Sequence, residues 1–221
     1  MALLKDILYK VPVRSVKGKL VTDITNLQID SRKVTQGSCF IAITGSNVNG
    51  NTFIDNAIAN GASVIICEQL PVTEDENVQY IVVENSAVAS GVIAHNFYGQ
   101  PSEKLKLVGV TGTNGKTTIA TLLYKLFSSL GYACGLISTV QNQIGTQTLA
   151  ATHTTPDAIS LNELLAKMVD TGCTHVFMEV SSHALHQHRI SGLHFTGGNH
   201  FRATLLMAGK LASLADPDLF H

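Results

Sequence analysis

Gly109-Val-Thr-Gly-Thr-Asn-Gly-Lys-Thr-Thr118 is the stretch that decides the fold. It continues a β-branched run that starts at Leu105 and opens a helical pattern over residues 116–130, so it is the turn of a strand–turn–helix unit. Gly112 and Gly115 let successive backbone N–H groups point inward at an anion, and the helix that starts near Lys116 adds the positive end of its dipole. The stretch therefore predicts a phosphate-binding loop.

ATP is the ligand that this loop predicts. Lys116 is placed to reach the β- and γ-phosphates, and Thr117 is placed to hold the Mg²⁺ that bridges them. The spelling departs from G-x-x-x-x-G-K-[ST], because the first glycine of that pattern falls at position 110, which is Val. A glycine-rich turn with a chance lysine is the alternative, which T-G-T-x-G-K-T-T after a strand disfavours. The predicted ATP-binding residues are Gly112, Thr113, Asn114, Gly115, Lys116, Thr117 and Thr118.

Strand and helix patterns alternate on both sides of the loop. Strands are expected at 39–43, 63–67, 80–83, 105–110, 133–138 and 174–180, and helices at 51–60, 86–98, 116–130 and 157–170. This alternation is typical of βαβ units, and it predicts an α/β fold with parallel sheets that carry helices on both faces. The second half shows only about three clear strands. Gly99-Gln-Pro-Ser102 marks the expected domain boundary.

Composition narrows the function classes. The 221 residues are 45% hydrophobic and 14% charged, with a net charge of -1, so there is no basic field for nucleic acid and no polybasic arm for a membrane. The N-terminus lacks an apolar signal-peptide core, and no stretch reads as a transmembrane helix. Four cysteines lie far apart without a CxxC pair, which indicates reduced, buried thiols. We expect a cytoplasmic monomer.

Four motifs, in order along the chain, resemble the Mur ligases. The first is Asp30-Ser-Arg-Lys-Val34, followed by the run Gly37–Gly45 and by Asn49-Gly50. The others are the loop Thr111–Thr118, the stretch His153-Thr-Thr-Pro-Asp157, and the run from Met178 to Arg189. The match extends from about residue 20 to Gly198. It implies a small N-terminal α/β uridine-nucleotide domain over 1–100, then an incomplete P-loop-containing parallel-sheet central domain over 101–198, and a non-matching tail over 199–221.

The resemblance implies an ATP-dependent ligase of peptidoglycan biosynthesis. Such an enzyme adds a third amino acid, meso-diaminopimelate or L-lysine, to UDP-N-acetylmuramoyl-L-alanyl-D-glutamate through an acyl phosphate. Two alternatives stay open. One is another Mur ligase or a folylpolyglutamate synthetase, which the Asp-Ser-Arg-Lys stretch and the run from Ser181 to Arg189 disfavour. The other is a non-catalytic module that binds a nucleotide or a UDP-sugar.

Site residues follow from the resemblance, position by position. Lys116 and Glu179 are the implied catalytic residues, and Thr117 and Glu179 are the implied Mg²⁺ ligands. The implied contacts to the UDP-muramoyl dipeptide are Ser31, Ser46, Asn47, Val48, Thr154, Thr155, Ser181, Gln187 and Arg189.

Each implied role has a plainer alternative. Glu179 also reads as a buried acid in an ion pair, Arg189 as a surface ion-pair partner, and Ser31 as the cap of a helix or turn. A zinc site among His183, His186, His188, His194 and His200 is a further possibility, but their spacing fits no structural zinc pattern. His153, His183 and His188 are expected to order the substrate loop instead.

The tail from Asn199 to His221 resembles none of the family's motifs. Its apolar residues have the spacing of one helix face: Phe201, Leu205, Ala208, Leu211 and Leu214. We expect a truncated product that arises from a change of reading frame near Gly198 and that performs no ligation. The alternative is a divergent short protein that functions.

Overall fold

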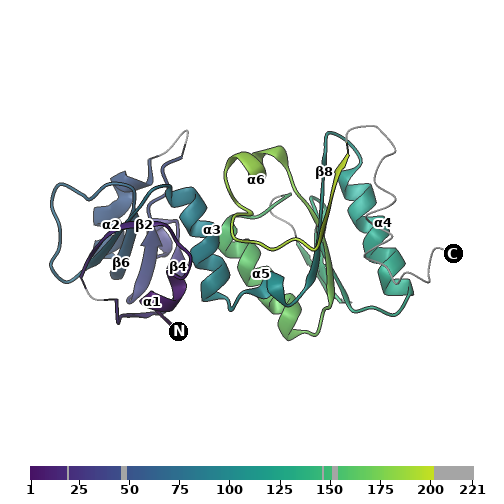
Figure 1. Ribbon diagram of the computed structural model, residues 1–221, viewed down its shortest axis with the longest axis horizontal. Coiled ribbons are helices and arrows are strands. Elements are labelled where there is room, and N and C mark those ends of the chain that lie inside the picture. The colour runs from purple at the N-terminus through teal and green to yellow at the C-terminus, as the bar shows by residue number, and fades with distance from the viewer. Residues whose placement is uncertain (19, 46–48, 146, 151–153, 202–221) are drawn as a thin grey trace. The chain divides into compact units, whose positions relative to one another are not determined.

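A computed structural model describes residues 1–18, 20–45, 49–145, 147–150 and 154–201 (Figure 1). The chain divides into two compact units. The first consists of Met1–Gly99 together with Gln187–Gly192, and the second consists of Gln100–His186 together with the chain from Leu193 onward. The first unit is therefore built from two separate stretches of sequence.

The first unit contains a five-stranded sheet in the order β2-β7-β6-β5-β4. Strand β2 runs antiparallel to β7, and the other neighbours are parallel. The β-branched runs at 63–67 and 80–83 form the buried middle of this sheet, as their apolar composition predicts. The strands are β2 (Val13–Lys17), β4 (Leu27–Gln28), β5 (Ser38–Ile41), β6 (Ala62–Cys67) and β7 (Gln79–Val83). A separate two-stranded sheet pairs β1 (Ala2–Leu3) with β3 (Asp23–Ile24).

Side-chain caps mark the start of helix α3 and of the two 3-10 turns of the first unit. The predicted helix over 51–60 consists of two parts, a 3-10 turn η2 (Gly50–Phe53) and helix α2 (Ile54–Ala59). Helix α3 (Ser86–Phe97) starts at Asn85, whose side chain accepts the N–H of Val88. The remaining elements are α1 (Leu4–Ile7) and the 3-10 turn η1 (Ser31–Lys33).

Small side chains form much of the buried face of α3. The helical spacing of Val88, Val92, Ile93 and Phe97 in the sequence predicts them as that face, but only Ile93 of these is buried. The residues buried with it include Ala89, Ser90, Gly91 and Ala94. The neighbouring backbone approaches this helix closely, which favours small residues where the sequence pattern favours large ones.

The second unit contains a six-stranded mixed sheet in the order β11-β10-β9-β12-β8-β13. The strands are β8 (Lys106–Gly112), β9 (Cys134–Ile137), β10 (Gln141–Ile144), β11 (Gln147–Ala150), β12 (His175–Glu179) and β13 (Gly197–Phe201). Strands β9, β12, β8 and β13 are parallel, whereas β10 and β11 are antiparallel additions at one edge. The expected parallel arrangement is confirmed for four strands, but the sheet has six strands where only about three were clear in the sequence, and the two at one edge are antiparallel.

Polar composition explains the missed strands. Strand β10 reads Gln-Asn-Gln-Ile and strand β13 reads Gly-Gly-Asn-His-Phe, so neither has an apolar run. Backbone pairing of β10 with β9 and of β13 with β8 maintains these strands in the absence of apolar runs. Phe201 pairs with Gly112 in β13, so it does not belong to the expected helix face. The other members of that face, from Leu205 to Leu214, lie outside the described residues.

Helices cover both faces of the second sheet, as expected. Helix α4 (Lys116–Ser129) packs on β8, β9 and β12, and α5 (Ala158–Asp170) lies on the opposite face (Figure 1). Asp157 caps α5 by accepting the N–H groups of Ile159 and Ser160. The core under α4 includes Val110, Phe127, Leu136 and Phe177. The unit also contains the 3-10 turn η3 (Pro101–Glu103) and helix α6 (Ser182–His186).

All four cysteines are free and buried, as predicted. Burial raises the pKa of the Cys39 thiol to about 12, and burial with nearby Glu74 and Glu68 raises that of Cys67 to about 11. Both thiols therefore stay protonated at neutral pH and are poor nucleophiles. Among the described helices, none has the length and apolar character needed to cross a bilayer.

Candidate functional site

The predicted phosphate loop connects β8 to α4. Gly112 has φ 143 and Gly115 has φ 80, values that a residue with a Cβ rarely adopts. Gly115 is the N-cap of α4, so the free N–H groups of the first helical turn open directly onto the loop. The geometry fits an anion at the start of α4, as the sequence predicts.

Lys116 folds its side chain back over the loop. Its Nζ donates to the carbonyl oxygen of Gly112 at 2.8 Å and lies 3.4 Å from that of Thr113. The ammonium is thus already held at the mouth of the turn, where a phosphate group would sit. Thr117 follows on the first turn of α4 and is half-buried.

Glu179 lies at the carboxyl end of the strand beside the loop. It pairs with Val110 in the parallel ladder of β12 and β8, and Val180 N–H donates to Val110 O at 2.8 Å. Its side chain is only 1% exposed. None of the ion pairs found among the described residues involves Glu179. The alternative of a buried acid in an ion pair is therefore wrong within that part of the chain.

Thr139 is the partner of the Glu179 side chain, and no motif in the sequence pointed to it. Its backbone N–H donates to Glu179 Oε1 at 2.9 Å, and its hydroxyl lies 3.1 Å from Glu179 Oε2. One residue therefore holds both carboxylate oxygens. Thr139 stands just after β9, whose end reaches the carboxyl end of β12 because the two strands are parallel neighbours. Sheet order, which sequence spacing does not reveal, brings the two together.

The Thr154–Thr155 pair lies at the same end of the sheet. Thr154 Oγ1 is 3.1 Å from Thr139 Oγ1. Thr155 is 1% exposed, and its hydroxyl donates to the carbonyl oxygen of Glu179 and accepts from the N–H of Ser181. Ser181 Oγ in turn accepts the N–H of Ala184 at the start of α6. These side chains join β12, α6 and the loop before α5 into one network.

The donor set at this end suits a metal ion that arrives with a nucleotide. Mg²⁺ usually takes one or two carboxylates and completes its shell with phosphate oxygens and water. Glu179 supplies such a carboxylate, and Thr117 supplies a hydroxyl on the first turn of α4. Within the described residues, no three His, Cys, Asp or Glu side chains gather to hold a metal by themselves. The residues present fit Mg²⁺ bound together with phosphate.

Ser31 lies in the first unit, in the turn η1. It is 5% exposed, and its carbonyl oxygen accepts from Asn60 Nδ2 at 2.9 Å. The cap of this turn is Asp30, which accepts the N–H of Arg32, so the alternative of Ser31 as the cap is wrong. Hydrogen bonds from the Arg32 side chain and backbone lower the pKa of Asp30 to about 2. The carboxylate therefore caps the turn throughout the neutral range.

Ser46, Asn47 and Val48, the other predicted uridine-site residues, lie outside the described residues. The positions that flank them are well defined. Thr44 and Asn49 form an antiparallel bridge, and Thr44 N–H donates to Ser86 Oγ at 3.1 Å. Glu68 Oε1 in turn accepts both the N–H and the hydroxyl of Ser86. The base of this loop is thereby fixed to the start of α3.

Gln187 and Arg189 belong to the short segment that joins the first unit. Arg189 donates through Nε and Nη2 to Gln187 Oε1, at 2.9 and 2.6 Å. His188 between them has φ 56, a left-handed conformation that turns the backbone and lets the two side chains meet.

The segment Gln187–Gly192 packs on α3 at a point where only glycine fits. A Cβ at Gly91 would lie 2.3 Å from the carbonyl oxygen of Ser191, and one at Gly192 would lie 2.9 Å from Val92 Cα. The backbone of α3 therefore contacts the backbone of Ser191 and Gly192 directly, with no side chain between them. This contact fixes Arg189 and Gln187 to the first unit.

Gly91→Ala is expected to destabilise this contact. In an ordinary helix, Gly→Ala stabilises by about 1 kcal/mol. Here the added methyl must displace a carbonyl group, so we expect a net loss of about 1–3 kcal/mol from the first unit. Urea unfolding measures the loss, and the rate of tryptic cleavage at Arg189 shows whether the segment has left α3. A stabilised variant with unchanged cleavage would contradict this packing.

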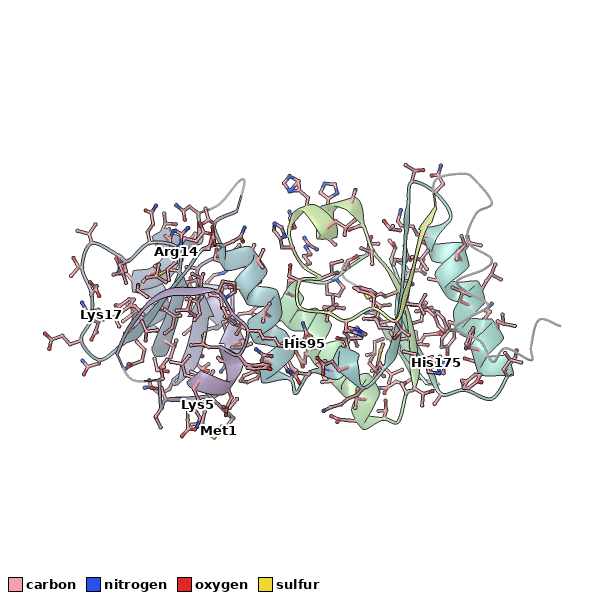
Figure 2. All side chains as sticks on the ribbon, in the orientation of Figure 1. Met1, Lys5, Arg14, Lys17, His95 and His175 are labelled. Atoms are coloured by element: carbon pink, nitrogen blue, oxygen red, sulfur yellow. The ribbon has the colours of Figure 1, made fainter. Side chains whose placement is uncertain are left out.

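The histidines do not form a metal centre in the described part of the chain. His183 and His186 are exposed on α6. His175 lies at the amino end of β12 (Figure 2), and its ring packs against Phe127 and Tyr132. Burial, with the nearby charge of Lys106, lowers the pKa of His175. This end of β12 is opposite to the end that carries Glu179.

The fold and the loop together define an α/β protein with a phosphate loop on its second sheet. Comparison with known families agrees: the Mur ligase middle domain matches residues 110–198, and the Mur ligase family catalytic domain matches residues 23–104. The chain belongs to the Mur ligase family.

Individual relatives carry the name UDP-N-acetylmuramoyl-L-alanyl-D-glutamate–2,6-diaminopimelate ligase. The protein from Cytophaga hutchinsonii is 58% identical over 196 residues, which is 88% of this chain and 40% of that protein. The one from Parabacteroides distasonis is 50% identical over 195 residues, with the same coverage. This chain thus spans about 40% of the length of the curated relatives that it matches.

Solved structures support the same family. A structure of a ligase with the same name matches 96% of this chain and 43% of its own, at 27% identity and a TM-score of 0.73. A MurF structure from Acinetobacter baumannii matches 81% of this chain and 36% of its own, at 19% identity and a TM-score of 0.55. The second likeness concerns the fold alone.

Proposed function

We propose that this chain binds ATP and the acceptor of an ATP-dependent ligase of peptidoglycan biosynthesis, and that it does not complete the ligation by itself. The acceptor is UDP-N-acetylmuramoyl-L-alanyl-D-glutamate, and the amino acid that the ligase adds is 2,6-diaminopimelate, with L-lysine as the alternative. The name shared by the relatives supports this substrate pair. The observation that carries the proposal is the placement of Lys116 and the buried Glu179 at adjacent strand ends.

The chemistry brings two anions together. A carboxylate oxygen of the acceptor attacks the γ-phosphorus of ATP, the bond to the β-γ bridging oxygen breaks, and ADP leaves. The amine of the incoming amino acid then attacks the acyl carbon, inorganic phosphate leaves, and the nitrogen loses a proton. Lys116 and the N–H groups at the start of α4 offset the negative charge that builds up in the first step.

Bound Mg²⁺ would supply positive charge that reduces the repulsion between the phosphates and the incoming carboxylate. In this proposal Thr117 and Glu179 would hold it. Thr139 and Thr155 hold Glu179 in turn, through its side chain and its carbonyl oxygen respectively.

In this proposal Ser31, Ser46, Asn47 and Val48 bind the uridine end of the acceptor. Thr154, Ser181, Gln187 and Arg189 bind the muramoyl-peptide part, where Arg189 supplies a planar set of donors that suits a carboxylate or phosphate. Thr155 contributes through the position of the Ser181 N–H, since its own hydroxyl is already engaged.

Calorimetric titration of the 221-residue chain tests the proposal. We expect the chain to bind ATP and UDP-N-acetylmuramoyl-L-alanyl-D-glutamate, and not to bind a dihydrofolate. Binding of the folate instead of the UDP-sugar would favour a folylpolyglutamate synthetase. Absence of ATP binding would sink the proposed function.

Ligation is tested separately with radiolabelled diaminopimelate. We expect no product from the 221-residue chain alone, even with both substrates bound. Appearance of labelled UDP-muramoyl tripeptide would contradict that expectation and would confirm the reaction directly. We also propose a cytoplasmic site of action and a monomeric state, and sedimentation velocity of the chain checks the latter.

A further inference from the structure

The turn that follows β9 places Thr139 directly over the carboxylate of Glu179. The backbone N–H of Thr139 contacts Oε1 at 2.9 Å, and its hydroxyl contacts Oε2 at 3.1 Å. The carboxylate plane is thus fixed by two donors from a single residue. Glu179 itself is 1% exposed, so water does not compete freely for these bonds.

The direction of the hydrogen bonds follows from the number of protons available. A carboxylate only accepts, and a threonine hydroxyl carries one hydrogen. Thr139 therefore gives its hydrogen to Glu179 Oε2. Thr154 Oγ1 lies 3.1 Å from Thr139 Oγ1 and is a second acceptor within reach of the same hydrogen. The negative charge of the carboxylate favours Glu179 as the acceptor.

Strand β10, at the antiparallel edge of the sheet, restrains the turn that carries Thr139 through hydrogen bonds with Ser138. Ser138 Oγ donates to Gln141 O at 2.7 Å, and Ser138 N–H lies 3.4 Å from Asn142 Oδ1. Both acceptors belong to β10, the strand that the sequence pattern did not predict. Ser138 and Asn142 are buried, so this turn has little freedom to move. The β9–β10 turn is therefore a rigid support for Thr139.

We propose that Thr139 is a positioning residue for the metal-binding carboxylate, and that it links Glu179 to Thr154 of the acceptor-binding stretch. This inference rests on the proposed function, in which Glu179 holds Mg²⁺ and Thr154 contacts the acceptor. With both oxygens fixed, Glu179 loses little side-chain freedom when the metal arrives. Without the hydroxyl, Oε2 lies buried without this donor, and the carboxylate rotates away from the geometry that the metal needs.

The test measures ADP affinity of the 221-residue chain with and without Mg²⁺, by calorimetry. The informative quantity is the ADP dissociation constant without Mg²⁺ divided by the one with Mg²⁺. This ratio reports how much the metal strengthens binding, apart from the affinity for the nucleotide alone. Thr139→Val removes the hydroxyl and keeps the shape. We expect it to lower the ratio about tenfold, the size expected when one hydrogen bond to a charged group is lost. Thr139→Ser keeps the hydroxyl and should retain the ratio within about twofold.

Thr171→Val is the matched control. Within the described part of the chain, its hydroxyl bonds to backbone carbonyls at the end of α5 and to the thiol of Cys173. This substitution should leave the ratio unchanged. Circular dichroism of each variant checks that it folds, and Thr139→Ser decides the matter if Thr139→Val does not fold.

The outcomes separate the inference from the function on which it rests. If Mg²⁺ leaves the ADP affinity of the unaltered chain unchanged, the metal role in the proposed function fails. If Mg²⁺ strengthens binding and Thr139→Val keeps the full ratio, the positioning role is wrong. Equal loss in the valine and serine variants also overturns it, because the hydroxyl is then not the cause.

The link to Thr154 has its own readout. Thr154→Val should raise the same ratio slightly, because it removes the second acceptor of the Thr139 hydrogen and leaves that hydrogen to Glu179. In a Thr139→Val background the additional effect of Thr154→Val should vanish. Effects that simply multiply would contradict the link through Thr139.

Discussion

Replacing Lys116 by alanine is expected to weaken ATP binding to the 221-residue chain by about 100-fold. The Lys116 ammonium rests on the carbonyl oxygens of Gly112 and Thr113, at the mouth of the phosphate loop. On ATP binding it can exchange these weak acceptors for charged phosphate oxygens without a large movement. Alanine removes both the charge and the donors, and the loop backbone alone must then hold the phosphates.

Lys125→Ala is the control for this experiment. Lys125 is an exposed lysine of the same helix, further from the loop, so its removal changes net charge equally. We expect its effect on ATP affinity to be less than about twofold, since exposed charges are screened by salt. A similar loss in both variants would show that general charge, and not the loop lysine, governs binding.

Phe177→Ala is expected to have the largest effect on stability. Phe177 is 1% exposed in β12, and its ring centroid lies 5.1 Å from that of Phe127 on α4. Its removal leaves a cavity between the sheet and α4, which costs about 3–5 kcal/mol of the second unit's free energy of unfolding. Hydrogen exchange at increasing urea concentrations measures this loss in peptides from β8, β9 and β12.

Phe177→Leu keeps most of the volume and should cost only about 1 kcal/mol. Peptides from β5 and β6 report the first unit and should be protected equally in all variants. A loss below about 1 kcal/mol in Phe177→Ala would mean that α4 collapses onto the sheet and fills the space. Equal loss of protection in β5 and β6 would mean that the two units unfold together.

The central strands were predictable from their apolar sequences, whereas the polar sequences of strands β10 and β13 gave no such signal. The strands at 63–67, 80–83, 105–110 and 174–180 carry consecutive β-branched or apolar residues, so their composition sufficed to place them. Strands β10 and β13 consist mostly of polar residues and glycine, and pairing with a neighbour alone maintains them. That pairing depends on sheet order, which no local pattern encodes.

In the candidate site, too, the residues within one local motif were predictable and the contacts made across the sheet were not. The phosphate loop was predictable because glycine conformation, helix start and lysine all lie within a few consecutive residues. Thr139 was not, because it meets Glu179 across a sheet at a sequence separation of 40 residues. The predicted contacts at Thr155 needed the structure for another reason: the residue type was informative, but only burial shows that its hydroxyl is already engaged.

The return of Gln187–Gly192 to the first unit also constrains how this protein can recombine with relatives. An exchange of residues 1–99 as one block would separate Gly91 from the Ser191 backbone with which it is matched. A chimera built in this way would join an α3 from one parent to a facing segment from another. Such hybrids should fold well only when residues 1–99 and 187–192 come from the same parent. The unit that can be exchanged is therefore a pair of segments and not one contiguous block.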